Sequence, residues 1–337
     1  MAPKAGRCLT ELTFQVAIRA VKKTHECHPA AYTRAVTAAR ILLVAAALAI
    51  LTLAPAAQAG HVECGDVLVR DTKLDSDVVC PPETDGLTIG ADDVTLDLKG
   101  HVISGNADYL GPPAVGVQAT GRTGLHIRNG TVTGFSTGVR LEASDSEVRD
   151  LNVDGASAII VNGDNNVVRR NEANGSFDAI SVTGSSAVVE RNTASAELAL
   201  NVAGSDPRVS RNVITECVIV GIQVTGYTDA RVHRNLAERG CIAGFEFRGT
   251  GARIERNTAF GSDIGLDIAD SSAIVSRNVA SFGVEGLVIR TPGTTVARNT
   301  ANHNASWGIN APGAIDGGGN RATGNGEPAQ CLGVRCK

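Results

Sequence analysis

The stretch Val168-Arg169-Arg170-Asn171-Glu172-Ala173 contains a phrase that the chain repeats eight times. The phrase has an aliphatic residue, usually an Arg, always an Asn, and usually an Ala two residues later. Successive Asn residues are separated by 20 to 23 residues. A period near twenty-one residues with one fixed polar residue is typical of a solenoid. The eight positions are Asn171, Asn192, Asn212, Asn235, Asn257, Asn278, Asn299 and Asn320.

Each repeat also contains a second constant segment, a small residue followed by an aliphatic, a variable residue and another aliphatic. Gly221-Ile222-Gln223-Val224 and Gly265-Leu266-Asp267-Ile268 are examples. Alternation with a period of two indicates a short strand with one buried face, whereas a helix needs roughly ten residues with a period of 3.6. Gly, Ser, Asn and Asp fill the gaps, so each repeat is predicted to be short strands joined by tight turns.

A repeat of this length with three short strands corresponds to one coil of a parallel β-helix, and parallel crossovers strongly favour the right hand. Strands of neighbouring coils would pair at about 4.8 Å, which places the inward Val, Ile, Leu and Ala in a narrow core. Asn tolerates the left-handed backbone of a tight turn, and stacked amides can bond to each other. We therefore predict an all-β chain, a single-stranded right-handed parallel β-helix of about ten coils with an asparagine ladder.

This pattern resembles the right-handed parallel β-helix repeat proteins of the pectin-lyase-like superfamily, whose asparagine ladder lies at such a turn. The resemblance covers roughly residues 90–325 and is specific for fold rather than for function. The chain departs from the catalytic motifs of several members. Asn192-Thr193 is followed by Ala rather than Asp, Asp206-Pro207-Arg208 stands in place of Asp-Pro-His, and the only Asp-Asp is Asp92-Asp93. These departures favour a non-catalytic protein.

An apolar run over residues 41–53 is preceded by Arg34 and Arg40 and followed by Ala57-Gln58-Ala59, which predicts a secretory signal cut after Ala59. An uncleaved membrane anchor is the alternative. The predicted order of segments is an N-terminal extension or over-long start (1–40), a signal peptide (41–59), an N-terminal cap and first coil (60–110), the parallel β-helix (111–320) and a C-terminal cap (321–337).

The predicted exported part is acidic. The whole chain has a net charge of −4. Residues 1–59 hold seven basic and two acidic residues, which leaves 24 basic against 33 acidic residues and a net charge of −9. An acidic body argues against nucleic acid as a partner. We therefore predict a secreted or cell-surface protein with an extracellular polysaccharide as the candidate partner, and no stable membrane span once the signal is cleaved.

Six cysteines follow the predicted cleavage site. An even count in an exported chain favours disulfides, although free buried thiols remain the alternative. Local pairing is the simplest arrangement, and two of the cysteines would lie before equivalent strands of adjacent coils. The simplest pairs are Cys64 with Cys80, Cys217 with Cys241, and Cys331 with Cys336.

The variable residue between two inward aliphatics should point out of the coil. Within this outward row, Asn201 and Gln223 are predicted ligand-binding residues, and Glu246 and Asp267 are predicted catalytic carboxylates. On adjacent coils their carboxyl groups would lie about 5 Å apart, the separation used by retaining glycoside hydrolases. A solvated strand face is the alternative. The row reads Arg140, Ile160, Ser181, Asn201, Gln223, Glu246, Asp267, Val288 and Asn310.

An Arg precedes nearly every ladder Asn. Stacked at about 4.8 Å, these residues would form a basic stripe that could hold an anionic polysaccharide through bidentate contacts. The alternative is turn packing, with Glu190 and Glu255 offsetting the charge. The stripe is Arg170, Arg191, Arg211, Arg234, Arg256, Arg277 and Arg298.

Other chemistry has weaker support. No cofactor is predicted, and Asp263, Asp267 and Asp270 are only a weak calcium candidate. The few exported aromatics, including Trp307, Tyr109 and Tyr227, weaken any sugar-stacking platform. The sequence therefore predicts a non-catalytic solenoid that contacts glycans or partners. The alternative is a carbohydrate-active enzyme, a lyase or a hydrolase, that works on the strand face from Asn201 to Asp267.

Overall fold

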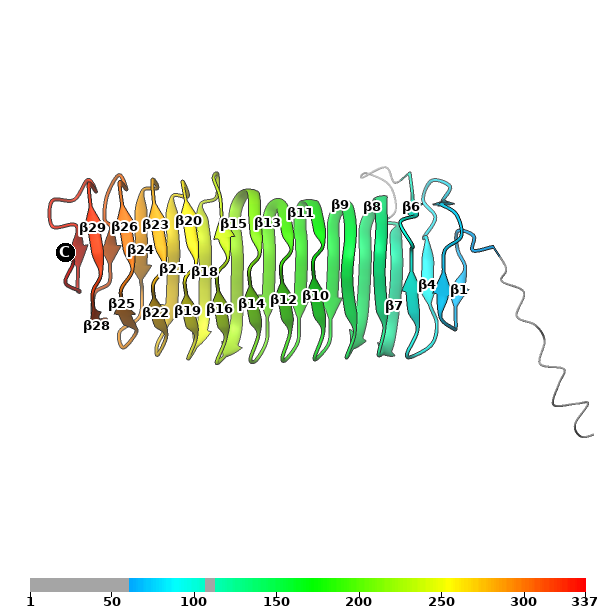
Figure 1. Ribbon diagram of the computed structural model, residues 1–337, viewed down its shortest axis with the longest axis horizontal. Coiled ribbons are helices and arrows are strands. Elements are labelled where there is room, and N and C mark those ends of the chain that lie inside the picture. Colours follow the sequence, from blue (N-terminus) through cyan, green and yellow to red (C-terminus); the bar gives the residue numbers. More distant parts are fainter. Residues whose placement is uncertain (1–60, 107–112) are drawn as a thin grey trace, which may run out of the picture. The chain divides into compact units, whose positions relative to one another are not determined.

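The computed structural model describes residues 61–106 and 113–337, and Figure 1 traces their strands in order. The predicted N-terminal extension and signal peptide lie outside the described residues. The described part belongs to one compact unit, His61–Lys337. Within it, no helix has the length and apolar character required to cross a membrane.

The described residues form 30 strands in a single sheet that winds into a coil. The N-terminal strands are β1 (Val67–Leu68), β2 (Thr72–Lys73), β3 (Val78–Val79), β4 (Leu87–Ile89), β5 (Thr95–Asp97), β6 (Val102–Ser104), β7 (Val115–Thr123), β8 (His126–Ser144) and β9 (Glu147–Asn162). The central strands are β10 (Val167–Arg169), β11 (Glu172–Thr183), β12 (Val188–Glu190), β13 (Thr193–Ala203), β14 (Arg208–Ser210), β15 (Val213–Thr228), β16 (Arg231–His233), β17 (Leu236–Ala237), β18 (Ala243–Thr250), β19 (Arg253–Glu255) and β20 (Thr258–Phe260). The C-terminal strands are β21 (Ile264–Asp270), β22 (Ile274–Ser276), β23 (Val279–Ser281), β24 (Glu285–Ile289), β25 (Thr295–Ala297), β26 (Thr300–Asn302), β27 (Ile309–Asn310), β28 (Ile315–Gly318), β29 (Arg321–Thr323) and β30 (Cys331–Leu332).

Each strand pairs in parallel with the equivalent strand of the neighbouring coils. β21, for example, pairs with β18 on one side and with β24 on the other. One coil is therefore made of three strands, for example β18, β19 and β20, with the ladder residue Asn257 between the last two. Figure 1 shows these strands side by side from β1 to β29. The all-β fold and the parallel β-helix predicted from the sequence are confirmed.

The coil count differs from the prediction, because the chain makes about 12 turns rather than about ten. The segment predicted as a cap and first coil contributes two coils, β1–β3 and β4–β6, which pair with each other and then with β7 and β8. Their aliphatic residues, among them Leu68, Leu74 and Val78, are buried in the same core as those of the later coils. These early coils lack the Asn phrase, which is why the repeat count missed them.

The core is a set of stacked aliphatic columns. The second residue of each three-residue strand before the ladder turn is fully buried. Burying such a side chain stabilises the fold by roughly 1.5–3 kcal/mol relative to leaving it exposed to water. Phe245 and Phe247 enlarge the core of one coil, with ring centroids 6.3 Å apart. One column consists of Val168, Val189, Val209, Val232, Ile254, Val275 and Val296.

The asparagine ladder is present from Asn171 to Asn320. Asn192 Nδ2 donates to Asn212 Oδ1 at 3.0 Å and to Val168 O at 2.9 Å, and the backbone N–H of Asn192 also donates to Asn212 Oδ1. The same bonds link each member to the next as far as Asn320. The residue before each ladder Asn adopts the left-handed region, with φ of 57° at Arg211 and 73° at Gly319. The tight turn is present, but the left-handed residue is not the Asn that the sequence analysis expected.

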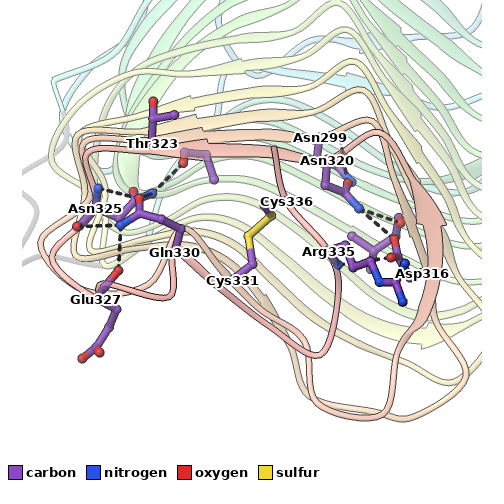
Figure 2. The surroundings of a disulfide bond; sticks show 12 residues. Asn299, Asp316, Asn320, Thr323, Asn325, Glu327, Gln330, Cys331, Arg335 and Cys336 are labelled. Atoms are coloured by element: carbon purple, nitrogen blue, oxygen red, sulfur yellow. Dashed lines mark hydrogen bonds between the residues drawn. A yellow bond between two sulfur atoms is a disulfide. The ribbon is translucent and has the colours of Figure 1, made fainter.

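Three disulfides are formed, Cys64–Cys80, Cys217–Cys241 and Cys331–Cys336. Figure 2 shows the last of them at the C-terminal end of the coil, with the Gln330 amide bonded to Asn325 nearby. Gln330 Oε1 also accepts the Asn325 backbone N–H, as Asn325 Oδ1 accepts that of Asn304 one coil earlier, so Gln330 ends a second, shorter stack of amides. The predicted C-terminal segment 321–337 thus continues the pairing through β29 and β30 and closes it with side-chain bonds.

Candidate functional site

The outward row predicted from the sequence lies in one register on a flat strand face. Gln223 pairs with Glu246, Glu246 with Asp267, and Asp267 with Val288 on successive coils. Asn201 pairs with Gln223 on the N-terminal side. The structure therefore brings the four predicted site residues together on β13, β15, β18 and β21.

Arginines that the sequence analysis did not consider lie among these side chains. Arg290 holds both oxygens of Asp267, with Nε at 2.5 Å and a terminal nitrogen at 3.0 Å. Arg248 reaches Asp267 at 3.1 Å and Glu246 at 3.4 Å. The hydrogen bond to Asp267 raises the pKa of Arg290. Arg248 and Arg290 follow outward positions by two residues, a spacing that places them on the same side of a strand.

These contacts change the role that the two carboxylates can play. Asp267 is only 5% exposed and both of its oxygens accept hydrogen bonds from cations. Glu246 is partly exposed, and its Oε1 also accepts a 3.4 Å hydrogen bond from Gln223. Among the described residues, the Asn201 Oδ1 atom is buried without a hydrogen-bond partner. The face is thus a network of paired charges next to two amides.

We expect Asp267→Asn to lower the free energy of unfolding by about 1–2 kcal/mol, because a buried carboxylate that holds two guanidinium groups becomes a neutral amide. Glu246→Gln is the matched control, since its contacts are longer and more exposed, and it should change stability by less than about 0.5 kcal/mol. Urea unfolding of both variants checks this difference. Equal losses would show that the Asp267 pairs do not stabilise the face.

The three aspartates of the calcium hypothesis do not converge. Asp263 is exposed and Asp267 is bound to arginines, whereas the fully buried Asp270 accepts the backbone N–H groups of Gly251, Ala252 and Ser272. Within residues 61–106 and 113–337, no group of three or more His, Cys, Asp or Glu side chains could hold a metal ion.

A groove that the sequence analysis missed lies at the corner between the strand after the ladder and the next strand face. It has a volume of about 600 Å³ and extends over four coils, from Gly175 to Gly240. We call it the corner groove. Its lining mixes apolar and polar groups: Ala196, Cys217 and Val218 lie beside Arg239, the hydroxyl groups of Ser176, Ser195 and Thr215, and the carboxylates of Glu197, Glu216 and Glu238.

An aromatic row continues the corner groove along the next three coils. The Phe260 and Phe282 rings have centroids 4.9 Å apart, and the Phe282 and His303 rings 5.2 Å apart. Arg239, which lines the groove, lies over Phe260 with its guanidinium carbon 6.0 Å from the ring centroid. Phe282 is 55% exposed and Phe260 is 37% exposed. Phe282 and His303 are 21 residues apart, a signal that the ladder period would have revealed, whereas Phe260 lies one position earlier in its coil.

The backbone under this row is of a kind that favours glycine. Phe282 has φ of 64° and His303 has φ of 56°, while the equivalent residues of the flanking coils are Gly261 and Gly324. A bulky side chain at positive φ is a genuine outlier and costs of order 1 kcal/mol or more. Two coils therefore carry exposed rings at a position where glycine would be less strained. Of the aromatics first considered, Tyr227 is buried and Tyr109 lies outside the described residues.

Comparison with known proteins agrees with this architecture. Residues 85–237 match a family model described as a right handed beta helix region. The Dettilon tailspike protein is similar in fold, with a TM-score of 0.56 and 16% identity over 77% of this chain and 64% of that chain. A catalytic domain of a GH87 α-1,3-glucanase has a TM-score of 0.47 and 13% identity, over 82% of this chain and 61% of that chain. An exopolygalacturonase from Thermotoga maritima has a TM-score of 0.40 and 6% identity, over 79% of this chain and 84% of that chain.

The chain spans less than two thirds of the length of the first two of these structures. No curated protein matches the sequence significantly. The parallel pairing, the asparagine ladder and the family match agree with one another. The described chain therefore has the right-handed parallel β-helix fold, and residues 85–237 match the right handed beta helix region family.

Proposed function

We propose that the protein is a secreted or cell-surface, non-catalytic solenoid that binds a neutral glycan along the corner groove and its aromatic row. The observation that carries the proposal is the exposed stack of Phe260, Phe282 and His303 on three successive coils. Pyranose rings have apolar C–H faces that pack on aromatic rings, which here recur once per coil. The three disulfides fit an extracellular location.

The groove lining supports a neutral rather than an acidic sugar. Glu197, Glu216 and Glu238 line it together, and carboxylates accept hydrogen bonds from hydroxyl groups but repel anions. Ser195 and Thr215 add hydroxyl groups that both donate and accept. A groove of this volume falls within the range of small-ligand sites. The predicted ligand residues Asn201 and Gln223 lie farther along two of the strands that line it, so a bound chain can reach them.

The test is Phe282→Gly. Gly is the residue that the backbone favours at this position, so we expect the free energy of unfolding to stay within about 1 kcal/mol of wild type. Loss of the central ring should weaken binding of the best neutral oligosaccharide, selected from β-glucan, xylan, mannan and α-glucan fragments, by about tenfold. Isothermal titration calorimetry measures the affinity and thermal unfolding the stability.

The matched control is Val79→Ala, which trims an exposed apolar residue far along the chain from the groove and should leave affinity unchanged. Phe260→Ala should reproduce the loss. The proposal fails if none of the four oligosaccharide classes binds, or if Phe282→Gly binds as tightly as wild type.

A carbohydrate-active enzyme is the second candidate, because carboxylates are the groups that glycosidases use. The acidic groove residues offer such groups, and so does the predicted pair Glu246 and Asp267, although the latter is held by arginines. Release of reducing ends or of unsaturated-uronate absorbance from a polysaccharide panel would favour this candidate over the binding function. Activity that disappears in Glu246→Gln, and not in Glu216→Gln, would assign it to the strand face.

A further inference from the structure

Arginines gather on a second face of the coil, the one formed by the strands before the ladder turn. Arg208, Arg231 and Arg253 are directly opposite one another on β14, β16 and β19. A second column, three residues farther along each coil, lies at the edge of the same face. All six side chains are exposed, and we call this set the arginine face: Arg208, Arg211, Arg231, Arg234, Arg253 and Arg256.

The same face of the earlier coils also carries arginines, and those up to Arg170 are paired. Arg128 contacts Asp97 at 3.1 Å, and Arg170 contacts Asp150 at 2.6 Å. The hydrogen bond from Arg170 lowers the pKa of Asp150 to about 2. Arg169 contacts Glu147 at 2.5 Å.

None of the six residues of the arginine face has a carboxylate oxygen within 4.0 Å in the part of the chain that the structure describes. Two acids, Glu190 and Glu255, occupy this face, and Asp206 and Asp229 lie at the preceding corner, all beyond ion-pair distance of these arginines. Burial, followed by the charges of Arg234 and Arg211, lowers the pKa of His233 between the columns. The face therefore carries six guanidinium groups without ion pairs against two acids, which leaves it with a net positive charge.

This arrangement opposes stability, because like charges directly opposite each other on neighbouring strands destabilise a sheet. Coils stack about 4.8 Å apart and residues advance about 3.3 Å along a strand, so the six Cα atoms cover a patch of about 10 Å by 10 Å. Guanidinium groups at this spacing present pairs of N–H donors on a flat face. They therefore suit a chain that carries anionic groups at regular intervals.

We propose that the arginine face binds an acidic polysaccharide, whose carboxylate or sulfate groups pair with the two arginine columns along the coil axis. This site is separate from the corner groove, which is lined with glutamates and is proposed to take a neutral glycan.

A polysaccharide fits better than nucleic acid or a membrane surface. The part of the chain after residue 59 has a net charge of −9, which disfavours binding to the extended negative surface of a duplex or a lipid bilayer. Among the described residues, the three strands of this face carry no Phe, Tyr or Trp on which a nucleobase could stack. A single narrow acidic chain can follow the two arginine columns along the coil axis.

The experiment measures binding of the full chain to heparin, which carries sulfates and carboxylates, and to hyaluronate, which carries carboxylates only. Dextran, duplex DNA and vesicles of phosphatidylglycerol and phosphatidylcholine are the comparison probes. We expect one or both acidic polysaccharides to bind, with an affinity that falls as ionic strength rises, because exposed charges are screened. The triple variant Arg208→Gln, Arg231→Gln and Arg253→Gln should bind at least about tenfold more weakly.

The control triple removes the same charge elsewhere, at Arg70→Gln, Arg321→Gln and Arg335→Gln, and should stay within about twofold of wild type. The triple variant Arg208→Lys, Arg231→Lys and Arg253→Lys keeps the positive charge. Its binding should therefore still weaken as ionic strength rises, with a lower affinity than wild type. Circular dichroism confirms that each variant is folded. The proposal is overturned if neither acidic polysaccharide binds, if both triples bind equally, or if DNA or the vesicles bind more tightly than both polysaccharides.

Discussion

Replacing Asn257 with Ala is expected to lower the free energy of unfolding by about 3–5 kcal/mol. The Asn257 amide donates to Val232 O and to Asn278 Oδ1, and its oxygen accepts the backbone and side-chain N–H groups of Asn235. Truncation leaves the Val232 carbonyl and the two Asn235 N–H groups without these partners, whereas Asn278 Oδ1 keeps the backbone N–H of residue 257. An unsatisfied buried group costs about 1–3 kcal/mol, and partial relaxation keeps the sum below the simple total.

The measurement is urea unfolding followed by circular dichroism, with Asn174→Ala as the control. Asn174 is exposed and donates one hydrogen bond, to Asp154 at 3.0 Å, so its loss should change stability by less than about 0.5 kcal/mol. If the two variants unfold at the same urea concentration, the ladder does not stabilise the coil. If Asn257→Ala broadens the transition instead, the loss is local to the coils above and below.

The ladder, the strand faces and their register could be predicted from the sequence because they repeat with the backbone. A strand position that recurs every 20 to 23 residues is stacked by the coil itself, so the outward row from Asn201 to Asp267 follows directly from spacing. The number of coils could not be predicted from the same signal. The first coils fold with His101 and Gly130 at the ladder position, so they carry no Asn to count.

The charge network and the corner groove were missed for a different reason. Arg290 reaches Asp267 from the next coil, and such a contact depends on side-chain conformations rather than on periodicity. The corner lies where the coils differ in length, between 20 and 23 residues, so its shape is set by insertions. Phe282 and His303 did follow the period, so aligning every position of the repeat, rather than the aliphatic ones alone, would have placed these two rings together, with Phe260 one position earlier in its coil.

Gly184→Ala is expected to destabilise the protein by about 3–5 kcal/mol, because it combines backbone strain with a clash. Gly184 has φ of +138°, and a Cβ atom there would lie 2.0 Å from the carbonyl oxygen of Gly163 on the preceding coil. Gly204 repeats the arrangement against Gly184 at 2.3 Å. The obstacle is backbone that takes part in the pairing between coils, so the clash is relieved only if the coils separate locally.

Gly226→Ala separates the two effects. Gly226 also has positive φ, +62°, but nothing lies within 4 Å of the position that an alanine methyl group would occupy, so only the backbone strain of about 1–2 kcal/mol applies. Thermal unfolding of both variants gives the difference. A loss at Gly184 that is no larger than at Gly226 would mean that the coils can move apart at this corner, and the close stacking of Gly163, Gly184 and Gly204 would then not restrain the spacing of the coil.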